Sequence, residues 1–437
     1  MNELESTISQ VIEENFIPFE WNDKIEKELE EINLDTNLPR KDLTKIPFIT
    51  IDGADAKDFD DAVHCFKNKT TYSLSVAIAD VAEIVKLKSA INDEALERGT
   101  SIYFPSKVIP MLPEKISNNL CSLVPNEIRN VLVCEINFDL EGDLQSYNFF
   151  EARIKSHQRM TYSEVEEYLN GNSSHLAKNV KKSIDTLYVL TNKLLFKRNK
   201  RQALEIDGQE PLLKMSNDGR VEEITLPKRL FAHQMIEEAM LAANVCAANF
   251  MNKHYKFGVY RIHEEPDNLK LESLKNFFSL KGYSESYKKE ALGIISQCLS
   301  HAKKQQLNKI FQTVVLQSLK RAEYSTKEIG HFGLQLDRYS HFTSPIRRYP
   351  DLMTHRLIKN VLHNGDLALD KDQIEEDCAE MSDLERIAEK SSRQVTQQMI
   401  CYYLKKYIGK EFNAVVTGMA DFGLFAEIDN FYVSGLI

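Results

Sequence analysis

The sequence predicts an α+β fold, because strand-like and helical patterns occupy different parts of the chain. Between residues 46 and about 160, short apolar runs with a period of two dominate, separated by turns that contain Asn, Gly and Pro. From residue 163 to about 407, apolar residues recur with the period of a helix. A run of strands followed by a run of helices is typical of α+β proteins.

Length and composition indicate a soluble globular protein. At 437 residues the chain exceeds one ordinary domain, and its hydrophobic content of 43% suits a sizeable core, so we expect two domains, one of them large. It has no apolar stretch of 18 or more residues, and its acidic start lacks the basic residues of a signal peptide, so we expect a cytoplasmic protein. The seven cysteines are scattered and include no Cys-x-x-Cys pair, which indicates neither a disulfide framework nor a zinc site.

The predicted elements begin with a charged helical lead-in over residues 1–45. In it, Trp21, Ile25 and Leu29 have helical spacing and Pro39 lies near the end, but the pattern points to no particular function. Strands are predicted at residues 48–51, 72–78, 131–138 and 149–154. Helices are predicted at 163–204, interrupted by a polar loop at 170–174, at 230–252, between about 268 and 325, and from 350 to 407.

After Lys410 the period returns to two, and three short strands are predicted between Phe412 and Ile437. Phe422 and Phe425 beside a glycine fit the aromatic face of an oligonucleotide-binding barrel (OB-fold), and they fit the core of a plain β-meander equally well. A five-stranded barrel needs roughly 70 residues and about 28 remain, so we expect either a fragment or a last domain that does not close.

The most informative feature is an acidic cluster at the end of the first predicted strand. Two carboxylates about 4 Å apart repel by roughly 4 kcal/mol at an effective dielectric constant near 20, so several converging ones must bind a metal, share protons or point into water. A solvated surface loop is therefore one interpretation. The apolar residues 48–51 before the cluster and 62–63 after it favour a buried setting instead. The cluster consists of five aspartates within ten residues: Asp52, Asp55, Asp58, Asp60 and Asp61.

In a buried setting these aspartates predict a metal site. Asp58 and Asp60 share one face of an extended segment and Asp61 takes the other, while Asp52 must return through a turn for which Gly53 is suited. At least three carboxylates can then converge. Oxygen ligands without His or Cys select Mg²⁺, with Mn²⁺ as the alternative. Such a site is typical of phosphodiester hydrolysis, in which a metal activates water and stabilises the leaving oxygen.

A second segment carries positive charge. The net charge of −10 argues against a nucleic-acid binder, but residues 301–360 hold 11 Lys and Arg against 4 Asp and Glu. Within this segment Arg347 and Arg348 lie between two prolines and offer planar, permanently charged forks for phosphate. The alternative is a loop that pairs with the protein's own acidic surface. The segment also contains three histidines without the spacing of metal ligands: His331, His341 and His355.

Together, the two segments resemble the ribonuclease II and ribonuclease R (RNB) family of exoribonucleases, and within it the ribonuclease R branch. The two long motifs at 51–63 and 330–352 occur in the family's order, and the resemblance runs from about residue 46 to 437. Further segments that look like those of the family are 76–81, 98–105, 110–113, 117–123, 236–240 and 260–264.

The resemblance implies an RNB catalytic domain over 46–407, with a β-sheet core and surrounding helices, and a truncated OB-fold RNA-binding domain over 408–437. It further implies a channel that admits single-stranded RNA with a free 3′ end to a buried Mg²⁺ site. Nucleotides then leave one at a time as 5′-monophosphates. We accordingly expect a processive 3′-to-5′ exoribonuclease that is monomeric and has no membrane partner.

Residue roles follow from matched positions. The family's four acidic positions correspond to Asp52, Asp58 and Asp61, which we expect to bind the metal, and to Asp60, which we expect to be catalytic. Arg347 matches the arginine that contacts the scissile phosphate. Tyr103 matches an aromatic residue that stacks on a nucleotide near the 3′ end, although it can also be read as a core tyrosine before a proline. Asp55 matches no site position.

Other residues in the family motifs have no individual role that the resemblance assigns, and structural support is an equal alternative for each of them. We include Arg348 among the expected RNA contacts. The remaining members of this group are Tyr260, Arg261 and His263.

The chain also departs from the family pattern. Ribonuclease R relatives carry cold-shock-like barrels before the catalytic domain, whereas about 45 residues precede it here. If this chain is all there is, we expect loose RNA affinity and an altered length preference. Two alternatives therefore stand beside the exoribonuclease: an RNA-binding module with lapsed catalysis, and a metal-dependent hydrolase of small phosphoesters.

Overall fold

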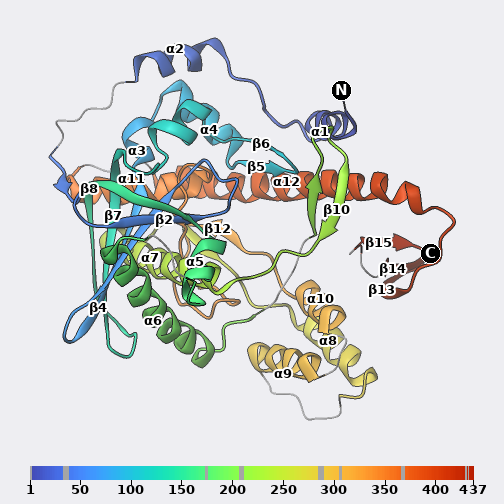
Figure 1. Ribbon diagram of the computed structural model, residues 1–437. Helices are drawn as coiled ribbons and strands as arrows, with labels where there is room; N and C mark the ends of the chain where they lie inside the picture. Colours follow the sequence, from blue (N-terminus) through green and yellow to red (C-terminus); the bar gives the residue numbers. More distant parts are fainter. Residues whose placement is uncertain are drawn as a thin grey trace.

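A computed structural model shows a strongly curved central β-sheet with helices on both of its faces (Figure 1). The mixture of strands and helices confirms the predicted α+β class. The residues that the structure describes are 2–32, 39–172, 176–205, 211–283, 290–304, 308–365, 370–428, 431 and 433–437.

Six strands form the central sheet in the order β1-β8-β2-β3-β4-β7. Because β8 also pairs with β7, the strands β2, β3, β4, β7 and β8 close into a ring. All four predicted strands of this region are confirmed. The observed bounds are β1 Lys41–Asp42, β2 Phe48–Asp52, β3 Asp61–Lys67, β4 Thr71–Ala79, β7 Ile128–Asp139 and β8 Leu144–Thr161.

The long strand β8 closes the ring because its two halves pair with different neighbours. Up to Lys155 it runs antiparallel to β7, and from Ser156 onwards it runs parallel to β2. The parallel pairing sets Asp52, the last residue of β2, opposite Thr161, the last residue of β8. Helix α5 (Tyr162–Leu169) follows at once, so its start lies beside the acidic segment.

Both faces of the sheet are buried. Eight of the nine residues of β4 are buried, and these include the small polar residues Ser73 and Ser75 as well as the apolar ones. On one face, Ile51, Val63 and neighbouring residues pack against α5, α6 (Lys178–Lys200) and α7 (Phe231–Tyr255). On the other face, Phe48 and Ala62 pack against α3 (Val81–Ile84), α4 (Ala90–Arg98), α11 (Tyr349–Leu362) and α12 (Lys371–Leu404).

The second part of the chain is helical, as predicted, although some elements were not foreseen. They include the short helices α3 and α4 within the strand-rich part, the hairpin of β9 (Leu212–Met215) and β10 (Val221–Thr225), and the paired strands β11 (Tyr260–Ile262) and β12 (Glu323–Ser325). Of the predicted loop at 170–174, residues 173 and 174 lie outside the described residues. The helices are α3 Val81–Ile84, α4 Ala90–Arg98, α6 Lys178–Lys200, α7 Phe231–Tyr255, α8 Asn268–Leu280, α9 Ala291–Lys304, α10 Asn308–Ser318, α11 Tyr349–Leu362 and α12 Lys371–Leu404, with a π-helical turn at Lys115–Leu120 and a 3₁₀ turn at Lys405–Tyr407.

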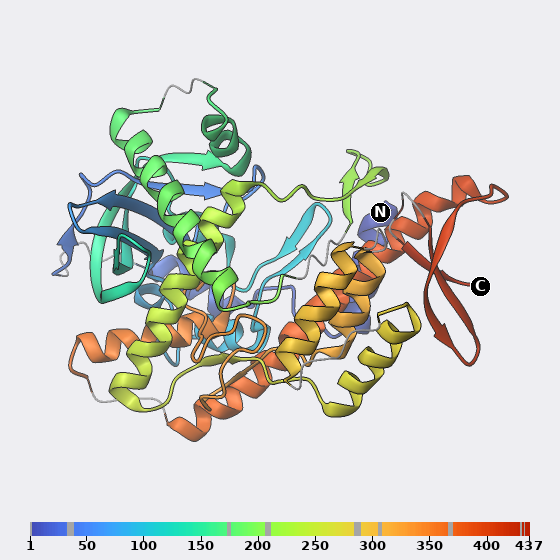
Figure 2. The ribbon, with the colours of Figure 1, turned by 90° about the horizontal axis from the view of Figure 1, so that it is seen from below.

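Helix α12 crosses the whole body and ends near the C-terminal strands (Figure 1). Its 34 residues correspond to a length of roughly 51 Å at 1.5 Å per residue. Helices α8, α9 and α10 form a separate group with their own apolar cluster, away from the sheet (Figure 2). None of the described helices is both long and apolar enough to cross a membrane.

The lead-in contains two helices, α1 (Glu3–Glu14) and α2 (Asp23–Glu31), which confirms its predicted helical character. The apolar side of α1 packs against α12, where Ile8 and Val11 share a cluster with Val395. Residues 33–38 of the lead-in lie outside the described part of the chain.

Three strands near the C-terminus form an antiparallel sheet of their own, as predicted: β13 (Ala414–Ala420), β14 (Gly423–Ile428) and β15 (Val433–Leu436). Phe422 is exposed at the turn between the first two strands, and its ring lies 6.1 Å from that of Phe425. The predicted third strand included Tyr432, which is not among the described residues.

Candidate active site

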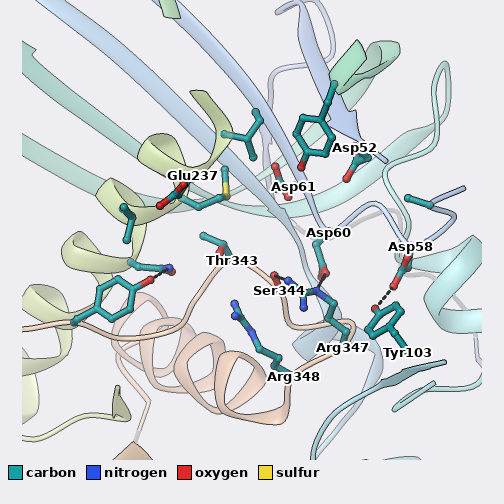
Figure 3. A pocket seen from close by; sticks show the side chains of 17 residues that line it. Asp52, Asp58, Asp60, Asp61, Tyr103, Glu237, Thr343, Ser344, Arg347 and Arg348 are labelled. Atoms are coloured by element: carbon teal, nitrogen blue, oxygen red, sulfur yellow. Dashed lines mark hydrogen bonds and ion pairs between the residues drawn. The ribbon is translucent and has the colours of Figure 1, made fainter. Parts of the chain in front are cut away.

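A pocket of about 390 Å³ lies where the acidic segment meets the loop before α11 (Figure 3). Its walls come from parts of the chain far apart in sequence: the loop between β2 and β3, the start of α5, the middle of α7 and the arginine loop at 344–348. The residues that line it are Asp52, Ala56, Asp58, Asp60, Asp61, Tyr103, Tyr162, Ile236, Glu237, Met240, Leu241, Asn244, Tyr339, Thr343, Ser344, Arg347 and Arg348.

The structure brings four of the five clustered aspartates to this pocket, and Asp55 is not among the lining residues. Asp52 ends β2 and Asp61 begins β3, whereas Asp58 and Asp60 lie in the loop between these strands. Of residues 58–61, only Asp61 belongs to a strand, because β3 begins there.

This loop is held in place by buried contacts. The backbone N–H of Phe59 donates to Oγ of Ser122 at 3.0 Å, and the same hydroxyl donates to the carbonyl of Lys57 at 2.7 Å. The carbonyl of Asp60 accepts from the backbone N–H of Ala79 at 2.9 Å. Asp60 itself is only 5% exposed. A solvated surface loop, the alternative interpretation of the cluster, does not describe this geometry.

The burial of several carboxylates together raises their pKa values. Burial, followed by the charges of Asp61 and Asp58, raises the pKa of Asp52 to about 8. Burial raises the pKa of Asp61 to about 7, although Arg347 opposes the shift, and it raises the pKa of Asp60 well above the usual range. Such a site stabilises either protons or a cation.

The donor set of the pocket fits a hard divalent cation, because every candidate ligand is a carboxylate oxygen. In addition, Oδ2 of Asp52 is buried and has no hydrogen-bond partner within the described residues. The four aspartates do not bring three oxygens within 4.8 Å of one another. Asp80, Glu83 and Glu151 do so, and they are the sole such group of His, Cys, Asp and Glu in the described ranges.

That second acidic group is already compensated by basic side chains. Nζ of Lys359 lies 2.7 Å from Asp80, 3.0 Å from Glu83 and 2.9 Å from Glu151. Arg40 lies 2.7 Å from Asp80. Burial would raise the pKa of Asp80, but Lys359 and Arg40 outweigh it, so the pKa is lowered. We interpret this group as an ion-pair network that supports the fold.

The arginine loop meets the acidic loop directly. The backbone N–H of Ile346 donates to Oδ1 of Asp60 at 2.9 Å, and Nε of Arg347 lies 3.7 Å from Oδ2 of the same carboxylate. Nη2 of Arg347 also donates to Oγ of Ser344 at 3.1 Å. With 40% of its side chain exposed, Arg347 faces the open part of the pocket.

Arg348 is held differently from Arg347. Its Nη2 donates to Oδ1 of Asp351 at 2.8 Å, and its side chain is 18% exposed. Burial alone would lower the pKa of Arg348, but Asp351 and nearby tyrosines outweigh this effect, so the pKa is raised. Both arginines thus line the pocket, and Arg348 is at the same time paired with Asp351.

Tyr103 lies on the hairpin of β5 (Ile102–Phe104) and β6 (Lys107–Ile109). Its hydroxyl donates to Oδ2 of Asp58 at 3.1 Å, and the residue is 42% exposed (Figure 3). The backbone carbonyl of Tyr103 accepts from Oγ of Ser392 on α12 at 2.7 Å. A core tyrosine, the alternative interpretation, does not fit this exposure.

Several lining residues were not singled out from the sequence. Tyr162 begins α5, and its pKa is raised by burial and by the charges of Asp61 and Asp52. Asn244 on α7 donates to the hydroxyl of Tyr339 at 3.0 Å and accepts from the backbone N–H of Phe342 at 2.9 Å. In the sequence, Asn244 sits in an ordinary helical pattern and Tyr162 lies just before a predicted helix. Only the position of β8 and α7 against the acidic loop brings these two side chains to the pocket.

The remaining residues to which the sequence assigned no role do not line the pocket, and those described here contact other parts of the fold. Arg261 makes two hydrogen bonds to Glu385, at 2.6 and 3.0 Å. Nε2 of His263 contacts the carbonyl of Lys320 at 3.0 Å. His355 is buried, with its ring stacked on Phe342. The remaining members of this set, Tyr260, His331 and His341, are also absent from the pocket lining.

Comparison with known proteins agrees with this architecture. The chain is 37% identical to the Ribonuclease R of Vibrio parahaemolyticus over 448 aligned residues, which cover 96% of this chain and 53% of that protein. It is 39% identical to the Ribonuclease R of Thermotoga maritima, with 91% of this chain and 58% of that protein covered. The chain thus spans about half the length of the curated relatives it matches.

Among solved structures, the chain resembles Mycoplasma genitalium RNase R in complex with ribose-methylated single-stranded RNA. The TM-score is 0.94 at 32% identity, and the match covers 99% of this chain and 70% of that chain. The family model described as "RNB domain" matches residues 40–364. With most of its length matched, and with the acidic loop and the arginine loop meeting in one pocket, this chain belongs to the RNB domain family.

Proposed function

We propose that this protein is a processive 3′-to-5′ exoribonuclease that hydrolyses single-stranded RNA to nucleoside 5′-monophosphates. The observation that carries the proposal is the contact of the arginine loop with the acidic loop, which aims an arginine and four carboxylates at one pocket. Membership of the RNB domain family supports it, as does the 37% identity to a Ribonuclease R.

In this proposal Asp52, Asp58 and Asp61 hold Mg²⁺, with Mn²⁺ as a substitute. When bound, the ion supplies an activated water and a positive charge near the leaving oxygen. Asp60 keeps Oδ1 on the backbone of Ile346, so Oδ2 remains to accept a hydrogen bond from the attacking water. The exposed guanidinium of Arg347 donates to the scissile phosphate and stabilises the charge that develops on its oxygens.

Tyr103 and Arg348 are the proposed RNA contacts beside the reaction centre. The ring of Tyr103 is exposed in the pocket while its hydroxyl is fixed by Asp58, so it offers a flat, oriented surface for the terminal base. A pocket of about 390 Å³ falls within the range of small-ligand sites, which suits the end of a strand better than a duplex.

The proposed organisation is a lead-in over 1–45, the RNB catalytic domain over 46–407 and part of an OB-fold RNA-binding domain over 408–437. The three-stranded sheet β13–β15, with exposed Phe422, supports the last assignment. The partner is single-stranded RNA with a free 3′ end, and we propose a monomeric protein of the cytoplasm.

The test is the digestion of a 5′-labelled oligoribonucleotide with Mg²⁺. We expect products that shorten from the 3′ end and the release of nucleoside 5′-monophosphates, while the same RNA with a 3′-terminal phosphate serves as the blocked control. Binding of the RNA without shortening would replace the proposal by an RNA-binding module with lapsed catalysis. Turnover of a generic phosphodiester without any effect on RNA would indicate a small-molecule hydrolase.

A further inference from the structure

Asp351 is a fully buried carboxylate in the first turn of α11, directly behind the arginine loop. Its Oδ1 accepts two hydrogen bonds, from the backbone N–H of Ser344 and from Nη2 of Arg348, both at 2.8 Å. Ser344 and Arg348 are the first and last residues of the arginine loop. One carboxylate oxygen therefore holds both ends of the segment that carries Arg347.

The middle of the same loop is fixed from the other side. The carbonyl of Arg347 accepts from the backbone N–H of Ser101 and from Oγ1 of Thr100, both at 3.0 Å. The backbone N–H of Ile346 donates to Asp60. Because the main chain is anchored on both sides of Arg347, the direction of its side chain follows from the loop rather than from contacts of its own guanidinium alone.

A buried carboxylate requires a charge partner, and Arg348 is the one that contacts Asp351. Removing Arg348 would leave Asp351 as an unpaired buried charge. Arg348, whose side chain is 18% exposed, must therefore balance a buried charge. The side chain of Arg347 is 40% exposed and faces the pocket. The two adjacent arginines therefore have different tasks.

We propose that Asp351 and Arg348 form a positioning pair that sets the arginine loop against Asp60, and that Arg347 alone of the two arginines meets the RNA phosphate. This inference rests on the proposed exoribonuclease function and refines it, since it moves Arg348 from the RNA contacts to the support of the loop. It predicts that the pair affects turnover, whereas Arg347 affects both turnover and the binding of phosphate.

The experiment compares Arg347→Met with the double variant Arg348→Met/Asp351→Leu, which removes the ion pair without leaving an unpaired buried charge. Single-turnover rates and RNA dissociation constants are measured for each. The dissociation constants are obtained in an Asp60→Asn background over a range of salt concentrations. Arg386→Met on α12, an exposed arginine outside the pocket, is the matched control for the loss of one positive charge.

For the double variant we expect a loss of at least 10-fold in rate, with the salt dependence of binding unchanged. For Arg347→Met we expect a similar loss of rate and a salt slope smaller by about 0.7, the value for one phosphate contact on a single strand. Adding Asp351→Asn to Arg347→Met should lower the rate little further, because the effects of substitutions in residues that act as a unit are not additive.

A reduced salt slope in the double variant would overturn the inference, because Arg348 would then contact phosphate. A wild-type rate in the double variant would overturn it as well. If the wild-type protein shortens no RNA, the proposed function fails first, and hydrogen exchange then tests the pair separately. In that measurement Asp351→Asn should speed exchange in residues 344–348 while β7 stays protected, and unchanged exchange in the loop would refute the positioning role.

Discussion

The backbone N–H of Ile346 donates a 2.9 Å hydrogen bond to Oδ1 of Asp60 across a sequence separation of 286 residues. This single bond joins the two segments that the sequence marks as chemically unusual, one acidic and one basic. It also orients the carboxylate, since Oδ1 is occupied and Oδ2 is directed toward Arg347 at 3.7 Å.

Asp60→Asn should preserve the fold and RNA binding while removing most turnover. Asparagine retains an oxygen that accepts the hydrogen bond from Ile346, but it loses the charge that we assign to the reaction. Loss of one electrostatic group of this kind costs about 3 to 4 kcal/mol in the transition state, which corresponds to a rate lower by roughly 10² to 10³. Mononucleotide release and RNA affinity, measured side by side, check this expectation.

The matched control is Asp55→Asn, which removes the same charge from the same loop outside the pocket lining. It should keep a wild-type rate. Equal rates for Asp60→Asn and the wild type would show that this cluster is not the reaction centre.

Tyr103→Ala should change the length of the smallest end product more than the rate on long RNA, because it removes the stacking surface beside the terminal nucleotide. Tyr103→Phe provides the control. It keeps the ring and loses only the hydrogen bond to Asp58, so product length should stay the same. Gel analysis of limit digests distinguishes the two variants, and an unchanged product length in Tyr103→Ala would exclude the stacking role.

Removal of divalent cations should abolish RNA shortening, and Mg²⁺ or Mn²⁺ should restore it. Asp52→Asn should raise the Mg²⁺ concentration needed for half-maximal rate, because it replaces a negatively charged carboxylate ligand by a neutral amide. A titration of rate against Mg²⁺ for both proteins measures this shift. A wild-type titration curve in the variant would place the ion elsewhere, and activity in excess chelator would contradict a divalent-metal enzyme.

Lys359→Met should destabilise the fold by about 3 to 5 kcal/mol at neutral pH, since it leaves the buried carboxylate of Asp80 with a single basic partner. The pKa of Asp80 is lowered in the folded protein. Its contribution to the stability of the fold is therefore complete above about pH 4 and is lost as the pH falls through the pKa of Asp80 in the folded state. The pKa of Lys359 is raised in the folded protein, so the contribution of Lys359 to stability is complete below about pH 10 and is lost at higher pH.

Urea unfolding at several pH values tests this prediction. The difference between wild type and variant should shrink in strong acid, where Asp80 is protonated in both proteins. Lys86→Met is the control, because Lys86 pairs with Glu83 on the surface and should contribute less than about 1 kcal/mol. A pH-independent difference between Lys359→Met and the wild type would contradict the ion-pair interpretation.

Local pattern predicted most elements of this fold, since buried strands leave short, largely apolar runs and amphipathic helices leave a helical periodicity. The closure of the sheet into a ring could not be predicted from local pattern. It depends on β8 pairing with β2 as well as with β7, and pairings between distant segments leave no local signal. The β9–β10 hairpin was missed because none of its residues is fully buried and they lack a strong apolar alternation.

For the candidate site, unusual residue types were informative and ordinary ones were not. Five aspartates in ten residues and two adjacent arginines stand out in any sequence. Asn244 and Tyr162 do not, because one lies within an apolar helix and the other follows a strand. The distinction between Arg347 and Arg348 required the structure as well, since only the contact with Asp351 separates their tasks.

The separation of 286 residues between Asp60 and Ile346 also bears on how the protein is made. Synthesis on the ribosome delivers the acidic half of the pocket long before the loop that completes it. A nascent chain thus carries the carboxylates without their arginine until translation has passed Arg347. Under the proposed function, an enzyme assembled in this order could not cleave RNA before its arginine loop has been made.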